Sequence, residues 1–189
     1  MILGLTGGIA SGKSTASEIL KKLGAIIIDA DKISHKVANS VEVIERVRET
    51  FGEEAILEGQ LNRQKLREII FKEKEKRTLL NNIMHPIIVG EMKEKIEKNR
   101  DKKLIVLDIP LLFETKLEYL CDKVLVIWVE ENIQIKRIME RDKNSEEMAR
   151  EILRSQMSLS EKLKKADYSI ENNGTIDNLE EKIRKILEF

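Results

Sequence analysis

The run of residues from Gly7 to Thr15, GGIASGKST in one-letter code, constrains this chain more than any other stretch. It contains the pattern G-x-x-x-x-G-K-[ST] between a short apolar run and a segment with helical periodicity. In this context the glycines let backbone N–H groups curve around a phosphate, beside Lys13 and the positive end of the helix dipole. The hydroxyl of Ser14 suits Mg²⁺, which neutralises charge during phosphoryl transfer. The run therefore predicts a nucleotide-phosphate site, since a plain turn would need neither Lys13 nor Ser14.

The charge balance excludes one broad class of function. The 189 residues contain 34 lysines and arginines against 34 aspartates and glutamates, and 41% are hydrophobic. A chain of this length suits one globular core with inserted pieces. Because proteins that bind nucleic acid through bulk charge are strongly basic, we expect no nucleic-acid partner and a local anion site.

The number of cysteines, the first residues and the length of the apolar runs indicate the expected cellular setting. Cys121 is the single cysteine, which excludes an internal disulfide framework and is most simply a small buried hydrophobe. The chain begins with an apolar strand rather than a charged leader, and no apolar run approaches the roughly 18 residues of a membrane span. We therefore expect a cytoplasmic protein without a membrane partner, either a monomer or a small homo-oligomer.

Apolar runs of strand length define the expected fold class. They are residues 1–6, 25–28, 104–107, 124–129 and 168–170. The unbroken apolar character of residues 104–107 and 124–129 indicates strands covered on both faces, and the intervening helical segments suit parallel crossovers. The sequence thus predicts an α/β fold with a doubly wound, five-stranded parallel sheet, whose ligands bind at the carboxyl ends of the strands. The loop of residues 7–15, Asp29, Asp31, Asp108 and Asn173 all fall at that edge.

Two stretches interrupt this alternation. Residues 32–99 show one helical stripe after another and no convincing strand, so we expect a helical insertion. Within it, His85-Pro86 should start a helix, because proline fits the first helical turn. Residues 132–165 form a charged helical segment before the last strand.

Carboxylates at the strand ends are candidates for the chemistry. Asp108 could serve the metal ion, directly or through water, or could cap a turn. Asp29 and Asp31 would lie on one side of an extended chain, where a carboxylate could accept the proton of an acceptor hydroxyl. Capping of the helix that enters the insertion is the other interpretation of this pair.

Arginines four residues apart share a helix face, as Arg137 does with Arg141 and Arg150 with Arg154. Guanidinium groups suit phosphate oxygens and the transferring group, whereas salt bridges to nearby glutamates are the alternative for both pairs. His85 could contact the acceptor, and could act as a base only within reach of its hydroxyl.

An ordered set of short motifs runs along nearly the whole chain. In order they are Gly4-Leu5-Thr6-Gly7-Gly8-Ile9, Asp29-Ala30-Asp31, Phe51-Gly52, Leu61-Asn62-Arg63 with Leu66 and Phe71, His85-Pro86, Pro110-Leu111-Leu112-Phe113-Glu114, Arg137, Arg141-Asp142, Gln156, Ala166-Asp167 and Asn172-Asn173-Gly174. Together they resemble the dephospho-coenzyme A kinase family of the P-loop kinase superfamily.

The resemblance implies an activity and an architecture. The activity is ATP-dependent phosphorylation of the ribose 3′-hydroxyl of dephospho-coenzyme A, the last step of coenzyme A synthesis, with Mg²⁺. The architecture is a single three-layer α/β/α domain with strand order 2-3-1-4-5 and a core of residues 1–31, 100–135 and 166–189. Residues 32–99 would be a helical insertion on the coenzyme A side, and residues 136–165 a lid.

Residue roles are implied position by position. Asp31 matches the general base, and Lys13 and Arg137 match the other catalytic positions. The ATP-side positions are Gly8, Ala10, Ser11, Gly12, Lys13, Ser14, Thr15, Arg141, Asn173 and Gly174. The acceptor-side positions are Thr6, Asp29, Arg63, His85, Pro110 and Leu111, and the metal positions are Ser14 and Asp108.

A few positions depart from the usual family pattern. Ala10 stands where glycine is usual, which is tolerable if this position does not need a positive φ. Asn62 holds a place often occupied by aspartate, and Glu58-Gly59-Gln60 replaces a common Asp-Gly sequence. Such changes in the insertion bear on its contacts rather than on the activity.

Two other function classes stay open. Another small-molecule kinase of this fold, acting on a nucleoside monophosphate or a sugar-like hydroxyl, is compatible with the arginines of the insertion, although Asp31 favours a hydroxyl acceptor. A nucleotide-dependent switch protein would need a segment that senses the γ-phosphate. The Asn-Lys-x-Asp and Asp-x-x-Gly motifs of a GTPase do not occur in the sequence.

Overall fold

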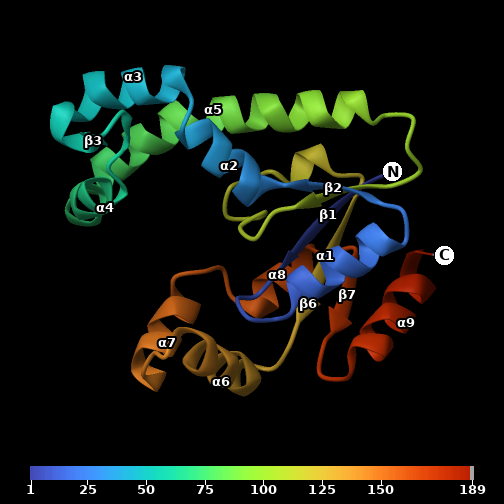
Figure 1. The fold of residues 1–189 in the computed structure, drawn as a ribbon. Coiled ribbons are helices and arrows are strands. Elements are labelled where there is room, and N and C mark those ends of the chain that lie inside the picture. The colour runs from blue at the N-terminus through green and yellow to red at the C-terminus, as the bar shows by residue number, and fades with distance from the viewer. Residues whose placement is uncertain (188–189) are drawn as a thin grey trace. The chain divides into compact units, whose positions relative to one another are not determined.

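Five apolar runs form one parallel sheet in the computed structural model, which describes residues 1–187 except the side chain of Lys74. The strands are β1 (Ile2–Gly7), β2 (Ile26–Asp29), β5 (Ile105–Asp108), β6 (Lys123–Trp128) and β7 (Tyr168–Glu171). Their order across the sheet is β2-β5-β1-β6-β7, with every neighbouring pair parallel (Figure 1). Numbered among themselves along the chain, they have the order 2-3-1-4-5. The predicted fold class and strand order are confirmed.

Helices α1 (Lys13–Lys22) and α9 (Ile176–Leu187) cover one face of this sheet. Because strand side chains alternate between two faces, every second strand residue meets the apolar stripes of these helices. Together they form one buried cluster: Leu3, Leu5, Ala16, Ile19, Leu20, Ala25, Leu104, Val106, Leu125, Ile127, Ile170, Leu179 and Ile183. Each fully buried leucine or isoleucine in it contributes roughly 1.5–3 kcal/mol to stability.

The loop after β5, which ends in the 3₁₀ turn η2 (Glu118–Leu120), covers part of the opposite face. A Cβ added to Gly4 would lie 2.7 Å from Cys121 Sγ and 3.0 Å from a methyl carbon of Leu112, so both side chains pack directly on β1. Burial raises the pKa of the Cys121 thiol to about 12, because the charged thiolate would lose its hydration. Cys121 is half-buried, so the prediction of a buried cysteine is met only in part.

The charged segment 132–165, expected as one helical stretch, is divided into α6 (Glu131–Asp142), α7 (Glu146–Arg154) and α8 (Leu159–Lys165). Ser145 caps α7, and Ser158 caps α8 through a reciprocal capping box. These serine hydroxyls accept hydrogen bonds from N–H groups that each helix start leaves without a partner, and so mark the breaks. Of these helices, α8 packs against β6.

The helical insertion forms a second unit with its own packing. It contains α2 (Ala30–Ala38), α3 (Val41–Phe51), the 3₁₀ turn η1 (Glu53–Ala55), α4 (Arg63–Lys72) and α5 (Lys74–Lys98). Helix α5 packs against α2, α3 and α4. In α3, Val43, Val47 and Phe51 are buried and form one apolar stripe.

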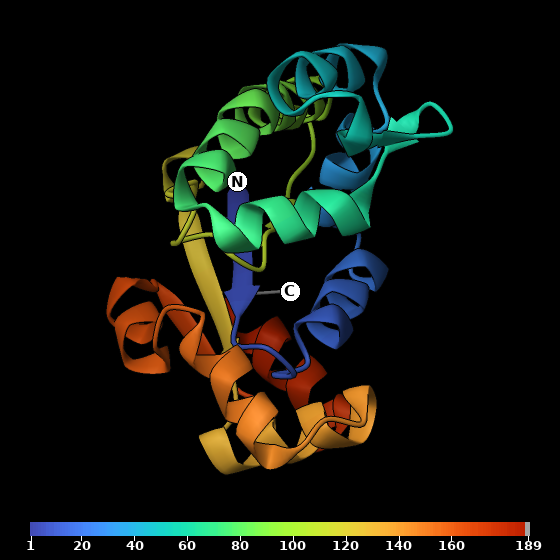
Figure 2. The same ribbon diagram turned by 90° about the vertical axis from the view of Figure 1, so that its left-hand side faces the viewer.

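The prediction that residues 32–99 contain no strand is wrong. β3 (Ile56–Leu57) and β4 (Gln60–Leu61) form a short antiparallel hairpin that stands out from the helices of this unit (Figure 2). Its turn residues Glu58 and Gly59 have φ values of +51° and +75°, the positive values that a tight hairpin turn requires. Strands of two residues are too short to show alternation, so only the glycine could have indicated the turn.

The prediction that His85-Pro86 starts a helix is also wrong. Pro86 lies inside α5, which continues without a break from Lys74 to Lys98. Proline removes one backbone donor from the helix interior, a cost of about 3 kcal/mol. The packing of α5 against α2, α3 and α4 offsets this loss.

The described chain divides into two compact units, Met1–Asp29 with the chain from Asn99 onward, and Ala30–Lys98. The functional boundaries predicted for core, insertion and lid stay predictions, and the last two residues of the core range 166–189 lie outside the described residues. Among the residues described, no helix has the length and apolar character needed to cross a membrane.

Candidate active site

The loop of residues 7–15, called the phosphate loop below, joins β1 to α1 in a conformation that depends on glycine. A Cβ on Gly7 would lie 2.3 Å from the carbonyl oxygen of Ile127, so this position admits no side chain. Gly12 has a φ of +87° and serves as the N-cap of α1. The first N–H groups of a helix lack helical partners and, with the helix dipole, attract an anion. The local geometry is therefore that of a phosphate site.

Lys13 and Asp108 form an ion pair at the carboxyl edge of the sheet, where Lys13 Nζ donates to Asp108 Oδ1. The two side chains are 19% and 9% exposed. Asp108 stands opposite Asp29 in the register of β5 and β2, so two of the predicted carboxylates share this edge. The pair holds the lysine beside the phosphate loop.

Arg137, on α6, is directed at the phosphate loop. It is half-buried and donates to the carbonyl oxygen of Ala10 at 3.2 Å and to that of Asn172 at 3.5 Å. A guanidinium has five N–H donors, so further donors remain for phosphate oxygens. Its placement suits the predicted role beside a nucleotide.

Gln134 and Asn172 also hold the loop, and the sequence did not identify either as a site residue. The side-chain amide of Gln134 donates to the carbonyl oxygen of Ile9 at 2.8 Å. The amide of Asn172 donates to the carbonyl oxygen of Ser11, also at 2.8 Å. The signal for Gln134 was its place three residues before Arg137, on the same helix face.

Alanine at position 10 was expected to be tolerable if the position needs no positive φ, and the structure does not meet this condition. The φ of Ala10 is +58°, in the left-handed region, where a Cβ costs roughly 1–2 kcal/mol. Its methyl group packs against the buried cluster of Ile135, Ile138 and Ala149, which joins α6 to α7. This packing offsets part of the strain and attaches the phosphate loop to the predicted lid segment.

Two of the other predicted arginines, Arg141 and Arg150, bind neighbouring carboxylates. Arg141 holds Asp142 through two contacts of 2.7 and 2.8 Å, which raise the pKa of Arg141 and lower that of Asp142. Arg150 pairs with Glu146 at 2.7 Å, so the salt-bridge interpretation is confirmed for Arg150. Arg154 lines the cavity described next.

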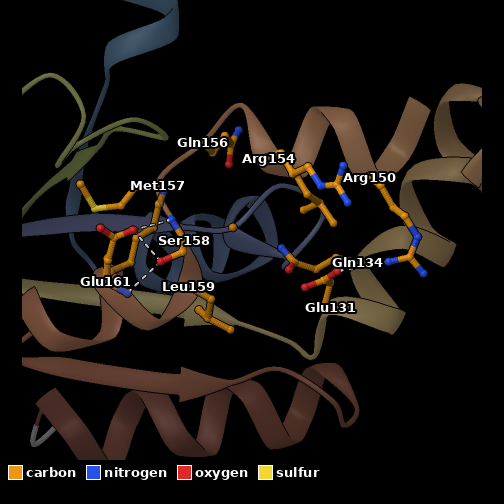
Figure 3. A pocket seen from close by; sticks show the side chains of 12 residues that line it. Glu131, Gln134, Arg150, Arg154, Gln156, Met157, Ser158, Leu159 and Glu161 are labelled. Carbon is orange, nitrogen blue, oxygen red and sulfur yellow. Dashed lines mark hydrogen bonds and ion pairs between the residues drawn. The ribbon is translucent and has the colours of Figure 1, made fainter. Parts of the chain in front are cut away.

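A cavity of about 480 Å³ borders the phosphate loop at Gly8 (Figure 3). The walls come mainly from α6, α7, α8 and the turn before α8: Glu131, Gln134, Arg150, Leu153, Arg154, Gln156, Met157, Ser158, Leu159, Glu161 and Lys162. Both signs of charge line it. The cavity thus extends the candidate site from the loop toward the α7–α8 turn.

A buried ion pair ties this turn to the core. Lys162 is 1% exposed, and its Nζ lies 2.9 Å from Glu114 Oε1, on the loop after β5. The same oxygen accepts a hydrogen bond from the N–H of Met157 at 3.0 Å. In the sequence, Glu114 is part of a motif and Lys162 is one of several charged residues in the segment 132–165, so neither indicated this pair. The pair anchors the end of the predicted lid segment.

Three predicted acceptor-side residues lie in the loop after β5 or contact it. Thr6 is wholly buried, and its hydroxyl donates to the carbonyl oxygen of Pro110 at 2.9 Å. Leu111 is 41% exposed. The buried hydroxyl of Thr6 therefore positions the loop and is not itself open to a ligand.

The other nucleotide-side positions differ in accessibility. Ser14 is exposed in the first turn of α1, and Thr15 beside it is half-buried. Ser11 Oγ is buried and makes no hydrogen bond within residues 1–187. Asn173 and Gly174 are exposed after β7. The accessible hydroxyl of Ser14 is suitably placed for a metal ion that accompanies a phosphate.

Asp31 lies in the first turn of α2 and is exposed. The expectation that Asp29 and Asp31 alternate along an extended chain is wrong, because β2 ends at Asp29 and α2 begins at Ala30. An acidic residue in a first turn also favours the helix through its dipole. The catalytic role of Asp31 stays a prediction.

The other predicted site residues of the insertion, Arg63 and His85, are exposed as well. Arg63 is the first residue of α4 and follows Asn62, whose side chain caps the helix by accepting from the N–H of Lys65 at 3.2 Å. Asparagine caps about as well as aspartate, which explains the departure at this position. His85 is exposed inside α5.

Comparison with known proteins gives one consistent result. A family model described as dephospho-CoA kinase matches residues 1–178. The chain is 45% identical to the dephospho-CoA kinase of Fusobacterium nucleatum subsp. nucleatum, over 100% of this chain and 97% of that one. The crystal structure of TT1252 from Thermus thermophilus is similar with a TM-score of 0.87 and 30% identity, over 100% and 96% of the two chains. Dephospho-CoA kinase from Campylobacter jejuni is similar with a TM-score of 0.75 and 36% identity, over 99% and 95%.

Proposed function

The chain belongs to the dephospho-CoA kinase family, and we propose on that premise that it phosphorylates the ribose 3′-hydroxyl of dephospho-coenzyme A with ATP. The products are coenzyme A and ADP, and the reaction completes coenzyme A synthesis. The observation that carries the proposal at the site is the phosphate loop, with Lys13 held at its edge by Asp108. We further propose that the reaction takes place in the cytoplasm, which suits a chain whose single cysteine is a free thiol.

The donor side binds the phosphates of ATP. The N–H groups at the start of α1 and the ammonium of Lys13 offset their negative charge. Arg137 keeps donors for the transferring group, and Arg141 is a second cation on the same helix. Asn173 and Gly174, exposed after β7, would contact the base.

The acceptor side provides the nucleophile and takes up its proton. The bond between the ribose 3′-oxygen and the γ-phosphorus forms while the bond from that phosphorus to the bridging oxygen of ADP breaks. The hydroxyl proton passes to the carboxylate of Asp31. Asp29, Arg63, His85, Pro110 and Leu111 would bind the rest of dephospho-coenzyme A.

The residues at the loop fit a magnesium ion that arrives with the nucleotide. Within the described residues there is no group of three or more His, Cys, Asp or Glu side chains that could hold a metal by itself. Mg²⁺ in phosphoryl-transfer sites needs no such group, because it is bound mainly by phosphates, water and one or two protein oxygens. Ser14 and Asp108 would supply these oxygens, and the ion would neutralise phosphate charge.

We propose residues 136–165 as a lid that excludes water from the transferring group. The support is local. The segment carries Arg137 and packs on Ala10 through the α6–α7 cluster. Its far end is fixed by the ion pair of Glu114 and Lys162.

The test is a coupled assay of ADP release with separate acceptors: dephospho-coenzyme A, adenosine monophosphate, thymidine monophosphate and shikimate. We expect turnover with dephospho-coenzyme A and none with the other three. Turnover with a monophosphate or shikimate, and none with dephospho-coenzyme A, would overturn the proposed function.

A further inference from the structure

We propose that Gln134 and Asn172 are positioning residues that hold the peptide groups of the phosphate loop in the orientation that binds nucleotide phosphates. The inference rests on the proposed function in that ATP is the donor, and it does not depend on which acceptor is used. Neither residue belongs to the nucleotide-side positions that the sequence indicates.

The argument begins with the two carbonyl groups that these side chains hold. Gln134 Nε2 donates to the carbonyl oxygen of Ile9, and Asn172 Nδ2 donates to that of Ser11, each at 2.8 Å. In a trans peptide the C=O and the following N–H point in opposite directions. The N–H groups of Ala10 and Gly12 are therefore turned away from the two amides.

These two N–H groups are left for an anion, together with the first N–H groups of α1. Within residues 1–187, neither the N–H of Ala10 nor that of Gly12 donates to an acceptor of the chain. The intervening N–H of Ser11 is already used, because it donates to the carbonyl oxygen of Gly8 at 3.1 Å. Two outward carbonyls thus correspond to two N–H groups without partners, which is the arrangement of a backbone anion nest.

The glycines of the loop provide a second, independent observation. A Cβ on Gly8 would lie 2.2 Å from Gln134 Nε2, and a Cβ on Gly12 would lie 2.1 Å from Asn172 Nδ2. Gly8 is not among the residues with positive φ, so its backbone conformation alone does not require glycine. The space that a side chain would fill at Gly8 is occupied by the amide of Gln134.

Both residues can act only by position. Gln134 is 6% exposed on α6 and reaches toward the loop between Glu131 and the arginines of α7 (Figure 3). Asn172 approaches from the end of β7. As neutral amides they orient the peptides without adding charge next to the phosphates. If either peptide turned over, a carbonyl oxygen would replace an N–H and would repel the bound anion.

The experiment replaces each amide by its nearly isosteric carboxylate, in Gln134→Glu and Asn172→Asp. A carboxylate cannot donate and repels the carbonyl oxygen that it faces. We expect each variant to bind ATP about tenfold more weakly or worse in calorimetry, and Gln134→Ala to bind it about three- to tenfold more weakly. The KM for dephospho-coenzyme A and the affinity for adenosine, which lacks phosphates, should be unchanged. Asn132→Asp, an exposed amide-to-carboxylate change on the same helix, is the matched control and should bind ATP normally.

A double-variant cycle tests the contact at Gly8 directly. Gly8→Ala should weaken ATP binding partly by displacing the amide of Gln134. The combined loss in Gly8→Ala/Gln134→Ala should therefore be smaller than the product of the single losses. If the double variant loses as much ATP affinity as the two single losses multiplied together, the two residues act independently. That result would contradict coupling through this contact.

Two results would overturn the inference. One is normal ATP affinity in Gln134→Glu and Asn172→Asp. The other is an equal weakening of ATP, adenosine and dephospho-coenzyme A, accompanied by a lower Tm, which would mark a merely structural role. Calorimetry with ATP needs no acceptor, so failure of dephospho-coenzyme A turnover would overturn the proposed function and leave this result to be decided separately.

Discussion

The two units hold their candidate site residues in different ways. In the sheet-containing unit, Lys13 is paired with Asp108, and amides from distant elements hold the phosphate loop. In the insertion, Asp31, Arg63 and His85 are all exposed. The difference indicates that the phosphate site is organised by the fold itself, whereas the insertion presents its candidate side chains without burying them. The predictions below test each side of this contrast.

The largest effect is expected on the acceptor side. Asp31→Asn removes the proposed proton acceptor and should lower kcat by about 10²–10⁴-fold, the usual contribution of general-base catalysis. ATP affinity should be unchanged, because the phosphate loop is held by residues of the other unit. Steady-state kinetics and calorimetry provide the two measurements.

The control is Glu45→Gln, which removes the charge of an exposed carboxylate in the same insertion. This variant should turn over normally. Near-normal turnover of Asp31→Asn would remove Asp31 from the base role. Loss of ATP binding in the same variant would break the contrast between the two units.

The next effect is on stability in the sheet-containing unit. Lys162→Met leaves the largely buried carboxylate of Glu114 without its cation and should cost about 3 kcal/mol. For a chain of this size that lowers Tm by roughly 6–12 °C. Thermal unfolding measures the shift, and Lys164→Met, exposed on the same helix, should leave Tm nearly unchanged.

The double variant Glu114→Gln/Lys162→Met should lose less than the sum of its single variants, because neither partner is then left charged and unpaired. Additive losses would show that the two side chains act independently.

A smaller effect on stability is expected from relieving backbone strain at two residues with positive φ. The side chain of one is exposed, and that of the other is packed. Lys143 ends α6 with a φ of +54° and is exposed, so Lys143→Gly should stabilise the protein by about 0.5–1 kcal/mol. Ala10→Gly relieves similar strain but loses the methyl that packs on the α6–α7 cluster, so its gain should be smaller. Denaturant unfolding compares the two. An equal gain would mean that the methyl of Ala10 contributes nothing to holding the loop.

The smallest effect concerns Cys121, which follows η2 and packs on Gly4 of β1. Because burial raises its pKa to about 12, the thiol should react with a thiol reagent at pH 8 far more slowly than in the unfolded chain. The folded pKa is the higher one, so the stability linked to this group is present below the ordinary thiol pKa of about 8.5. It is lost as the pH rises from there toward 12. Equal labelling rates in the folded and unfolded states would contradict the burial.

The sequence correctly predicted those features whose patterns depend on residues close to one another in the chain. The apolar runs predicted the five strands, and the phosphate loop predicted its helix and its anion site, because both patterns depend on neighbouring residues. The hairpin at Glu58-Gly59 and the proline inside α5 were misjudged. The hairpin strands are too short to show a period, and packing along α5 overrides the local signal of Pro86.

The sequence by itself determined the family, the strand order that the family implies, and the residues predicted to contact phosphate. Only the tertiary structure decided which groups hold those residues in place. Gln134 lies 125 positions from Ile9, and Asn172 lies 161 positions from Ser11. Contacts over such separations leave no periodic trace, since they arise only when the sheet brings β1, α6 and the end of β7 to one edge.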